Sequence, residues 1–346
     1  MSDFARRLVR WQSRHGRHDL PWQRTRDPYR IWLSEVMLQQ TQVATVIPYY
    51  RRFLARFPSV TALARATVED VLTLWSGLGY YTRARNLHAA AQAVMTRHRG
   101  RFPRSRESLE SLPGLGRSTA AAIAVFAFGR REAILDGNVK RVLARYFAIR
   151  GVPSERRLWA LAESELPSKS IEAYTQALMD LGAGVCTRQR PACAECPLKG
   201  GCRAYAKGRV EAYPARRARK NRPVRNTSML LLLCEGEVLL ERRPPTGVWG
   251  GLWCLPEFEP GAGELAARRI LPVLRHEFTH FTLDITPIVG FLDATSPRAR
   301  EPGQVWLSVE DAIGAAIPAP VRKLLAGLRS GGLLGQPAAL EKALQD

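Results

Sequence analysis

The chain has 346 residues, which exceeds what one hydrophobic core usually organises, so we expect two domains. Its 52 Lys and Arg against 31 Asp and Glu give a formal net charge of +21, which favours a polyanionic partner such as nucleic acid and salt-sensitive binding. An anionic membrane would suit the same charge, so the motifs must decide. The sequence contains neither a signal-peptide core nor a membrane-spanning run, which predicts a cytoplasmic protein.

The first 205 residues have a helical pattern, with apolar side chains every three or four positions and breaks at residues such as Pro28, Pro48 and Gly100. Within them, the segment IWLSEVMLQQTQV is apolar on nearly every side of the expected helix and contains Glu35. We therefore expect Glu35 to be buried, and desolvation would raise its pKa. The alternative, a surface glutamate, fits poorly with Trp32 and Val36 beside it.

Residues 107–128 predict a helix, a tight turn at 112–116 and a second helix. The turn reads Leu112-Pro113-Gly114-Leu115-Gly116, and its two glycines permit a hairpin whose free backbone N–H groups point outward at a helix N-terminus. Such a terminus binds phosphate. An ordinary turn between two helices is the alternative, because Leu-Pro-Gly alone is common.

The segment AILDGNVKRVLARYF places Asp136 in a bend before a helix, where it is suited to cap the helix. Backbone N–H groups at a helix start also keep a carboxylate ionised. Together with Glu35, Asp136 would make a pair of carboxylates with separated pKa values, which can supply a proton and a stabilising negative charge to one reaction. From these residues alone, a simple helix cap remains the simpler interpretation of Asp136.

Four of the six cysteines are spaced C-x6-C-x2-C-x5-C: Cys186, Cys193, Cys196 and Cys202. Four thiolates suit either zinc or a [4Fe–4S] cluster. Structural zinc usually uses two C-x2-C pairs, whereas this run has one pair and two unequal arms, so we favour the cluster. Cys234 and Cys254 lie outside this loop and are expected to be buried structural residues.

After the cysteines, residues 206–226 are expected to form a basic linker, with eight Lys and Arg between Lys207 and Arg225 against the single acid Glu211. Residues 227–346 are expected to form an α+β domain. The run SMLLLLCEGEVLLERR predicts two strands joined by a Glu-Gly turn, and HFTLDITPIVGFL adds further strand.

Together, these motifs resemble the MutY-type adenine DNA glycosylases of the endonuclease III superfamily. The resemblance implies a helix-hairpin-helix at 107–128 that holds DNA, a [4Fe–4S] loop at 186–202 that is structural and DNA-sensing, and a monomer that acts on duplex DNA containing adenine opposite 8-oxoguanine or guanine. The site residues that it implies are Glu35 as general acid, Asp136 as catalytic carboxylate, Asn138 as an orienting residue, Lys140 near DNA, Gln40 and Tyr80 beside the mispair, Trp22 as a wall of the adenine pocket, and Leu112, Gly114, Gly116 and Ser118 at the hairpin.

The residue type at position 118 distinguishes two activities within this superfamily. Endonuclease III has a lysine nucleophile at this position, which forms a Schiff base with the sugar, and without that lysine the resemblance implies a glycosylase that leaves an abasic site. A bifunctional lyase is the alternative, as is a non-catalytic iron–sulfur sensor, against which both carboxylates argue.

The segment VLLERRPPTGVWGGLWCLPEFE resembles the opening of a Nudix fold, but only Glu264 follows where such hydrolases place several glutamates to hold Mg²⁺. Pyrophosphate hydrolysis is therefore expected to be lost. MutY enzymes use a Phe-Ser-His loop in this domain to recognise 8-oxoguanine, and here Phe278-Thr279-His280 assigns that role to Thr279 and His280. The predicted fold is thus an all-α helix-hairpin-helix glycosylase domain (1–205) with a cluster loop, followed by an α+β Nudix-like domain. Through DNA binding, such a bacterial protein would associate with the nucleoid.

Overall fold

The computed structural model describes residues 1–215, 221–258, 268–292 and 302–330, so linker residues 216–220 and Glu264 lie outside the described residues. The chain divides into two compact units. The first comprises residues 1–66 and 86–219, and the second comprises residues 67–85 and 220–346. Among the described helices, none has the length and apolarity needed to cross a bilayer.

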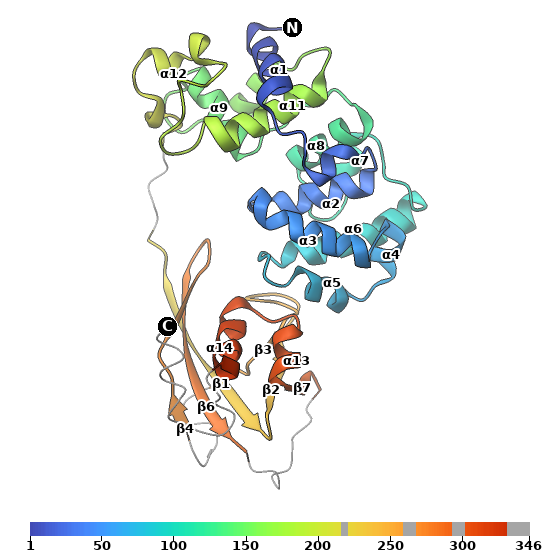
Figure 1. The fold of residues 1–346 in the computed structure, drawn as a ribbon, viewed down its shortest axis with the longest axis vertical. Coiled ribbons are helices and arrows are strands. Elements are labelled where there is room, and N and C mark those ends of the chain that lie inside the picture. The colour runs from blue at the N-terminus through green and yellow to red at the C-terminus, as the bar shows by residue number, and fades with distance from the viewer. Residues whose placement is uncertain (216–220, 259–267, 293–301, 331–346) are drawn as a thin grey trace. The chain divides into compact units, whose positions relative to one another are not determined.

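The described part of the first unit is helical, as expected (Figure 1). Its helices are α1 (Asp3–His15), η1 (Pro21–Arg24), α2 (Pro28–Leu38), α3 (Val43–Arg56), α4 (Val60–Arg65), α6 (Thr82–His98, which starts in the second unit), α7 (Arg106–Glu110), α8 (Arg117–Phe128), α9 (Gly137–Tyr146), α10 (Glu155–Ser164), α11 (Ile171–Asp180), the π-helical turn η2 (Leu181–Val185), η3 (Lys199–Gly201), α12 (Arg203–Ala206) and η4 (Val210–Ala212).

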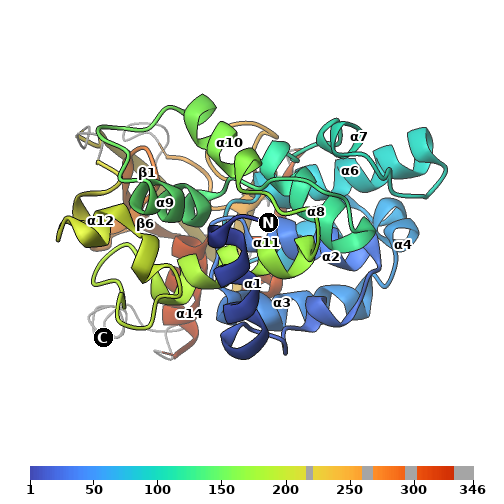
Figure 2. The same cartoon turned by 90° about the horizontal axis from the view of Figure 1, so that it is seen from above.

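A hydrophobic core of this unit lies where α1, α8, α9 and α11 meet, and α1 and α11 lie side by side in both ribbon views (Figures 1 and 2). Phe4 and Leu8 of α1 pack there against Tyr174 and Leu178 of α11. The helix α8 also packs against α2. Because α8 is rich in alanine, these neighbours approach it closely, which brings α2 and α11 to a common centre.

Local sequence sets the ends of α2, which carries Glu35. Asp27 caps its N-terminus by accepting from the Tyr29 backbone N–H at 2.9 Å, and Pro28 occupies the first helical position. The helix ends at Leu38, and Gln40 then adopts a left-handed backbone with a φ of 59°. The chain therefore turns sharply just after the helix.

The second unit contains a mixed sheet with strands β1 (Val224–Cys234), β2 (Glu237–Arg242), β3 (Trp253–Cys254), β4 (Arg268–Ile270), β5 (Leu274–Glu277), β6 (Thr282–Phe291) and β7 (Gln304–Ser308). Among the described strands the order is β3-β2-β1-β6-β4, while β5 also pairs with β6 and β7 with β2. The central pair, β1 and β6, is parallel from Val224–Thr282 to Leu233–Phe291. The unit also holds α5 (Val68–Trp75), α13 (Val309–Gly314) and α14 (Ala319–Ser330).

The predicted Glu-Gly turn is confirmed. Leu233 pairs with Val238 and Cys234 with Glu237 in an antiparallel hairpin, and both Glu235 and Gly236 have positive φ, at 49° and 80°. Two consecutive left-handed residues form the turn whose twist matches that of the flanking strands.

Two boundaries differ from the sequence expectation. The strand β1 begins at Val224, inside the expected linker. Its first three side chains are all exposed, so the alternation of buried and exposed residues that marks a half-buried strand is missing there. Residues 67–85 belong to the second unit, although they lie within the expected N-terminal domain. Polar side chains connect them to it: the Trp253 indole N–H donates to Glu69 at 2.5 Å, and Arg322 donates to the Ser76 hydroxyl at 2.7 Å.

Candidate active site

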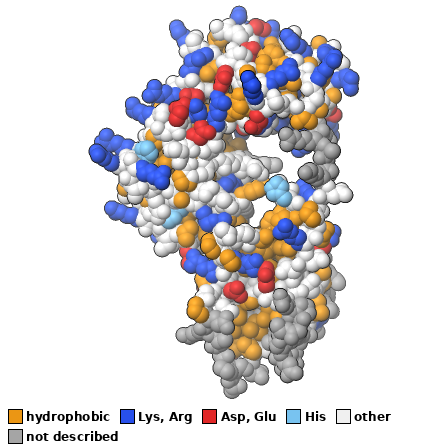
Figure 3. Space-filling model, turned by 180° about the vertical axis from the view of Figure 1, so that it is seen from behind, with side chains coloured by type: hydrophobic (Ala, Val, Ile, Leu, Met, Phe, Trp, Pro, Cys, Tyr) orange, Lys and Arg blue, Asp and Glu red, His pale blue; other side chains and the backbone are white. Residues whose placement is uncertain are grey.

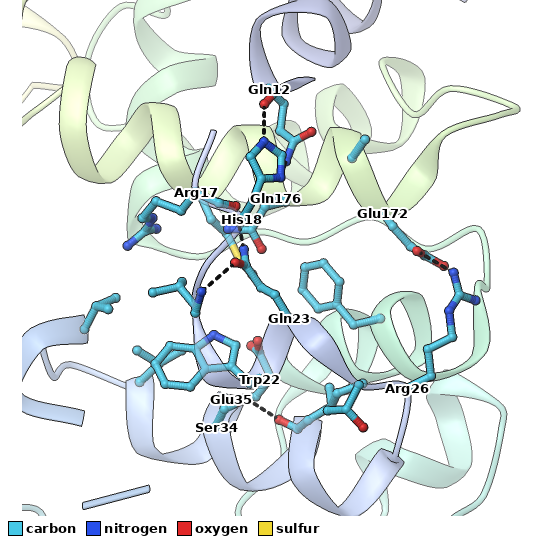
Figure 4. Close-up of a pocket in the computed structure, with 18 residues that line it drawn as sticks. Gln12, Arg17, His18, Trp22, Gln23, Arg26, Ser34, Glu35, Glu172 and Gln176 are labelled. Atoms are coloured by element: carbon cyan, nitrogen blue, oxygen red, sulfur yellow. Dashed lines mark hydrogen bonds and ion pairs between the residues drawn. The ribbon is translucent and has the colours of Figure 1, made fainter. Parts of the chain in front are cut away.

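A cavity of about 380 Å³ opens in the first unit, lined by residues of α1, η1, α2 and α11 and of the loops between them (Figure 4). Trp22 and Glu35 both line it, as do His18, Gln23 and Gln176. Trp22 is buried and packs edge-to-face on Tyr50 with ring centroids 5.4 Å apart. The cavity thus combines an aromatic wall with amide, imidazole and carboxyl groups, a typical composition of small-molecule sites.

The Glu35 side chain is partly accessible, and its carboxyl faces the cavity. The adjoining Ser34 and Val36 are buried. Burial raises the pKa of Glu35 to about 8, and the charge of Asp136 raises it further in the same direction. No described residue forms a hydrogen bond with this carboxyl. Glu35 therefore holds a proton at neutral pH that it can donate to a bound molecule.

Asp136 caps α9, accepting from the Val139 backbone N–H at 2.8 Å, as the bend in the sequence indicated. Burial raises the pKa of Asp136, whereas the backbone N–H groups of Val139 and Asn138 and the positive charges of Arg141 and Lys140 lower it. The net effect is a raised pKa, and the backbone N–H groups and cations are what favour the ionised form of Asp136 against burial. The charge of Asp136 raises the pKa of Glu35, whereas backbone N–H groups and two cations lower that of Asp136, so the shared negative charge resides on Asp136 and the proton on Glu35.

Asn138 lies beside Asp136 and is fixed by Arg141, whose guanidinium donates to the Asn138 side-chain oxygen at 2.8 Å. The same guanidinium donates to the backbone oxygens of Gly182 at 2.6 Å and Cys186 at 2.7 Å. Gly182 approaches so closely that an added Cβ would stand 2.4 Å from the Asn138 Cβ. Sequence reasoning missed Arg141, although its place on the helix that Asp136 caps was a usable signal.

The four clustered cysteines line one small cavity together with Arg145. Arg145 is almost fully buried and donates to the Cys186 sulfur at 3.3 Å and to the Thr187 backbone oxygen at 2.6 Å. Within the described chain, no three His, Cys, Asp or Glu side chains converge closely enough to hold one metal ion. In a zinc site all four sulfurs would lie about 2.3 Å from a single ion.

Residues 112–116 form the expected hairpin turn between α7 and α8. Leu112 is buried, and Gly114 has a φ of 78° and packs so tightly that a Cβ there would stand 2.7 Å from the Asn86 Cβ. Gly116 caps α8 in an extended conformation with open space around it. Lys and Arg side chains, with some acidic ones among them, project from the face of this unit seen in Figure 3.

Ser118 and Lys140 both have partners within the protein. The Ser118 hydroxyl accepts from the Leu135 backbone N–H at 2.9 Å, directly before Asp136 in the chain. Lys140 forms an ion pair with Glu155 at the start of α10. Ser118 therefore supports the segment that carries Asp136.

Gln40 and Tyr80 are exposed and both have positive φ, at 59° and 50°. In the second unit, the Tyr80 hydroxyl lies 3.3 Å from the Thr279 hydroxyl. Thr279 and His280 are exposed in the turn between β5 and β6, flanked by Phe278 and Phe281, whose rings stack 4.5 Å apart. The structure thus places Tyr80 and Thr279 together, although 198 residues separate them in the sequence.

Comparison with known proteins gives the same picture. Residues 33–168 match the HhH-GPD superfamily of base excision DNA repair proteins, and residues 228–327 match the NUDIX domain. The chain is 36% identical over 339 residues to the adenine DNA glycosylase of Buchnera aphidicola subsp. Baizongia pistaciae (strain Bp), a match covering 94% of this chain and 97% of that protein.

Two solved structures resemble the helical part. A thermostable thymine-DNA glycosylase is 30% identical with a TM-score of 0.55 and covers 59% of this chain and 95% of its own. Endonuclease III in a non-covalent DNA complex is 23% identical with a TM-score of 0.53, covers 59% of this chain and 94% of its own, and shares the fold. The predicted architecture of a helix-hairpin-helix domain followed by a Nudix-like domain is confirmed, and the chain belongs to the adenine DNA glycosylases of the MutY type.

Proposed function

We propose that this protein is a monofunctional glycosylase that hydrolyses the N-glycosidic bond of adenine opposite 8-oxoguanine or guanine in duplex DNA and thereby initiates base excision repair. The observation that carries the proposal is the carboxyl pair of the first unit. Glu35 holds a proton in the wall of the cavity, and Asp136 lies near enough for its charge to raise the pKa of Glu35.

In the proposed reaction the adenine is turned out of the helix into the cavity, where Trp22 supplies an apolar wall. Glu35 donates its proton to adenine N7, and the bond between N9 and the sugar C1′ breaks with its electron pair remaining on the base. The sugar becomes an oxocarbenium ion that the negative charge of Asp136 stabilises. A water molecule then adds to C1′ and passes a proton to the Glu35 carboxylate, which restores the protonated acid and leaves an abasic site.

The monofunctional assignment rests on Ser118. A lyase step needs an amine that forms a Schiff base with C1′, and a hydroxyl cannot do so. The Ser118 hydroxyl also accepts a backbone hydrogen bond from Leu135, which suits a supporting role. We therefore expect strand breaks only where alkali cleaves the abasic product.

DNA is proposed to be held by the hairpin and its neighbours. The free N–H groups at the start of α8, near Gly114 and Gly116, would bind a phosphate, while buried Leu112 anchors the turn. Lys140 would lie close to the backbone beside Asp136. Gln40 and Tyr80 would fill the space that the extruded adenine leaves.

A [4Fe–4S] cluster is proposed as the resident cofactor of Cys186, Cys193, Cys196 and Cys202. The four thiols line one small cavity, and four cysteine thiolates are the ligand set that such a cluster needs. The buried Arg145 guanidinium would offset the negative charge of the thiolates. When bound, the cluster would supply structural stability to the loop, while Glu35 and Asp136 carry out the reaction.

Recognition of 8-oxoguanine is proposed for Thr279 and His280. Both side chains are exposed in a turn flanked by the stacked Phe278 and Phe281 rings, and Arg225 lies over the Phe281 ring at 4.5 Å. Because the Thr279 hydroxyl approaches that of Tyr80, both would contact the same side of the mispair.

The test is single-turnover release of free adenine from a duplex with one A·8-oxoguanine pair, with the wild type compared with Asp136→Asn. Asparagine caps helices as well as aspartate does, so the variant should fold while losing the charge. We expect release by the wild type only, with strand breaks appearing after alkali. No release by wild-type protein with its cluster in place, or breaks before alkali, would overturn the proposal.

A further inference from the structure

The loop that carries Tyr80 has an unusual backbone. Gly77, Gly79 and Tyr80 all have positive φ, at 94°, 76° and 50°. Glycine adopts such angles freely, but a tyrosine there is strained and persists only where surrounding contacts enforce it. Nearly half of the Tyr80 surface is nevertheless exposed. The loop therefore projects a strained aromatic side chain into solvent, and something must hold it there.

Arg83, in the first turn of α6, supplies much of that support. Its guanidinium donates to the backbone oxygens of Gly79 at 3.1 Å and Leu78 at 3.4 Å. The same group lies 5.4 Å from the centres of both the Tyr80 and the Trp75 rings. Only 9% of Arg83 is exposed. The arginine thus contacts the loop backbone and the face of the tyrosine together.

Trp75, at the end of α5, gives the same loop a second support. It is fully buried, and its indole N–H donates to the same Gly79 oxygen at 3.1 Å. The Gly79 carbonyl is therefore fixed by two donors, and the peptide that follows it leads directly into Tyr80. Rotation of Tyr80 into an ordinary backbone conformation would break these bonds.

Retaining a cation here is costly. Burial lowers the pKa of Arg83 to about 10, because removing the charged guanidinium from water costs free energy. At neutral pH the group remains charged. A guanidinium can donate two N–H groups in one plane and stack on aromatic rings with the same plane, whereas the ammonium of lysine is a compact, strongly hydrated charge. The contacts of Arg83 use both properties.

We propose that Arg83 is the positioning residue of Tyr80, fixing the tyrosine ring in the orientation in which it enters the base stack beside the mispair. The proposal rests on the proposed function, in which Tyr80 occupies the stack. In this proposal Arg83 contacts no DNA itself, but it determines how well Tyr80 enters the base stack. A role in folding alone would give Arg83 no link to Tyr80 in the reaction.

The experiment is a double-mutant cycle with Arg83→Lys, Tyr80→Ala and the combined variant, all with the cluster in place. Single-turnover adenine release is measured together with the fluorescence of 2-aminopurine placed next to 8-oxoguanine. We expect Arg83→Lys alone to slow release by about 10-fold to about 100-fold, as small misplacements do, and to reduce the fluorescence change on binding. In the Tyr80→Ala background the same lysine should add no further loss. Arg97→Lys, an exposed change on the same helix, is the matched control.

The proposal would be overturned if Arg83→Lys slowed adenine release equally in the wild-type and Tyr80→Ala backgrounds, or if it left the fluorescence response unchanged. Arg83 would then act independently of Tyr80. A wild type that releases no adenine would overturn the proposed function instead. The fluorescence comparison needs only binding, so it would still decide the role of Arg83 in that case.

Discussion

Glu35 can act as a general acid only while it is protonated, and its pKa of about 8 sets the pH range in which it can do so. We expect the single-turnover rate of adenine release to be level below about pH 7 and to fall about tenfold per pH unit well above pH 8. Glu35→Gln should be slower by about 10²-fold to about 10⁴-fold, and its rate should not change with pH in this range.

The measurement is a rate profile from about pH 6 to about pH 10 at saturating enzyme. Glu172→Gln is the matched control, because Glu172 lines the same cavity but pairs with Arg26 at 2.8 Å. A wild-type profile that is flat through pH 8 would remove Glu35 from the role of proton donor.

The same pKa predicts a cost in stability. The pKa of Glu35 is about 8 in the folded protein against the ordinary 4.5 in an unfolded chain, so between these values the folded state binds more protons. The free energy of unfolding therefore falls as pH rises through this window, by up to about 1.4 kcal/mol per pH unit. Glu35→Gln removes the titrating group, so it should be more stable than the wild type, and increasingly so towards pH 8.

Denaturant unfolding of protein carrying the proposed cluster, at about pH 5 and about pH 8.5, would measure this difference in the free energy of unfolding, which we expect to grow by roughly 1–5 kcal/mol between the two. The neighbouring Asp136 contributes to the shift, so Asp136→Asn should reduce the difference without abolishing it. If the difference in unfolding free energy between Glu35→Gln and wild type stayed constant with pH, burial of the Glu35 charge would not destabilise the folded protein.

At the scale of elements, the hairpin at 112–116 contains two glycines, of which only Gly114 has a backbone conformation and a close neighbour that disfavour a side chain. Gly114→Ala must strain a φ of 78° and bring a Cβ within 2.7 Å of Asn86, so the turn has to move. Gly116→Ala adds its methyl group to open space at an ordinary backbone conformation. We expect Gly114→Ala to destabilise the protein by about 1–3 kcal/mol and to weaken DNA binding, and Gly116→Ala to leave stability within about 1 kcal/mol.

Thermal unfolding and binding to a duplex in an Asp136→Asn background, where the DNA stays intact, would test this contrast. Equal effects of the two substitutions on stability would mean that the left-handed backbone at Gly114 is not what shapes the turn. If Gly116→Ala alone weakened binding while the fold stayed intact, the open space beside Gly116 would be where a phosphate approaches.

The elements that sequence predicts well here are those whose signal is local. The Asp136 cap, the hairpin glycines and the Glu235-Gly236 turn are each written within a few consecutive residues, and each is found in place. The residues that sequence missed act across the chain. Gln176 and His18 meet in one cavity only because α11 packs on α1, and no local pattern marks such a meeting. Burial of the charged Arg83 could not be predicted either, because arginine side chains are usually exposed.

At the scale of the whole molecule, the net charge of +21 makes a quantitative prediction about DNA binding. Ion pairs such as Arg7–Asp3 and Arg117–Glu163 cancel charges of both signs, so they leave the excess of cations unchanged. Each phosphate that these cations neutralise releases counterions, and the logarithm of the affinity then falls linearly with the logarithm of salt concentration.

With Asp136→Asn we expect a slope of about −4 to −8 between about 50 mM and about 300 mM salt, measured by fluorescence anisotropy on a duplex with one A·8-oxoguanine pair. The same duplex with an ordinary A·T pair should bind more weakly with the same slope, because phosphate contacts carry no sequence information while Thr279 and His280 are proposed to read the lesion. Parallel lines would therefore separate the two kinds of contact. A slope near zero would exclude the phosphate clamp, and lines that differ in slope would mean that lesion recognition itself recruits further phosphate contacts.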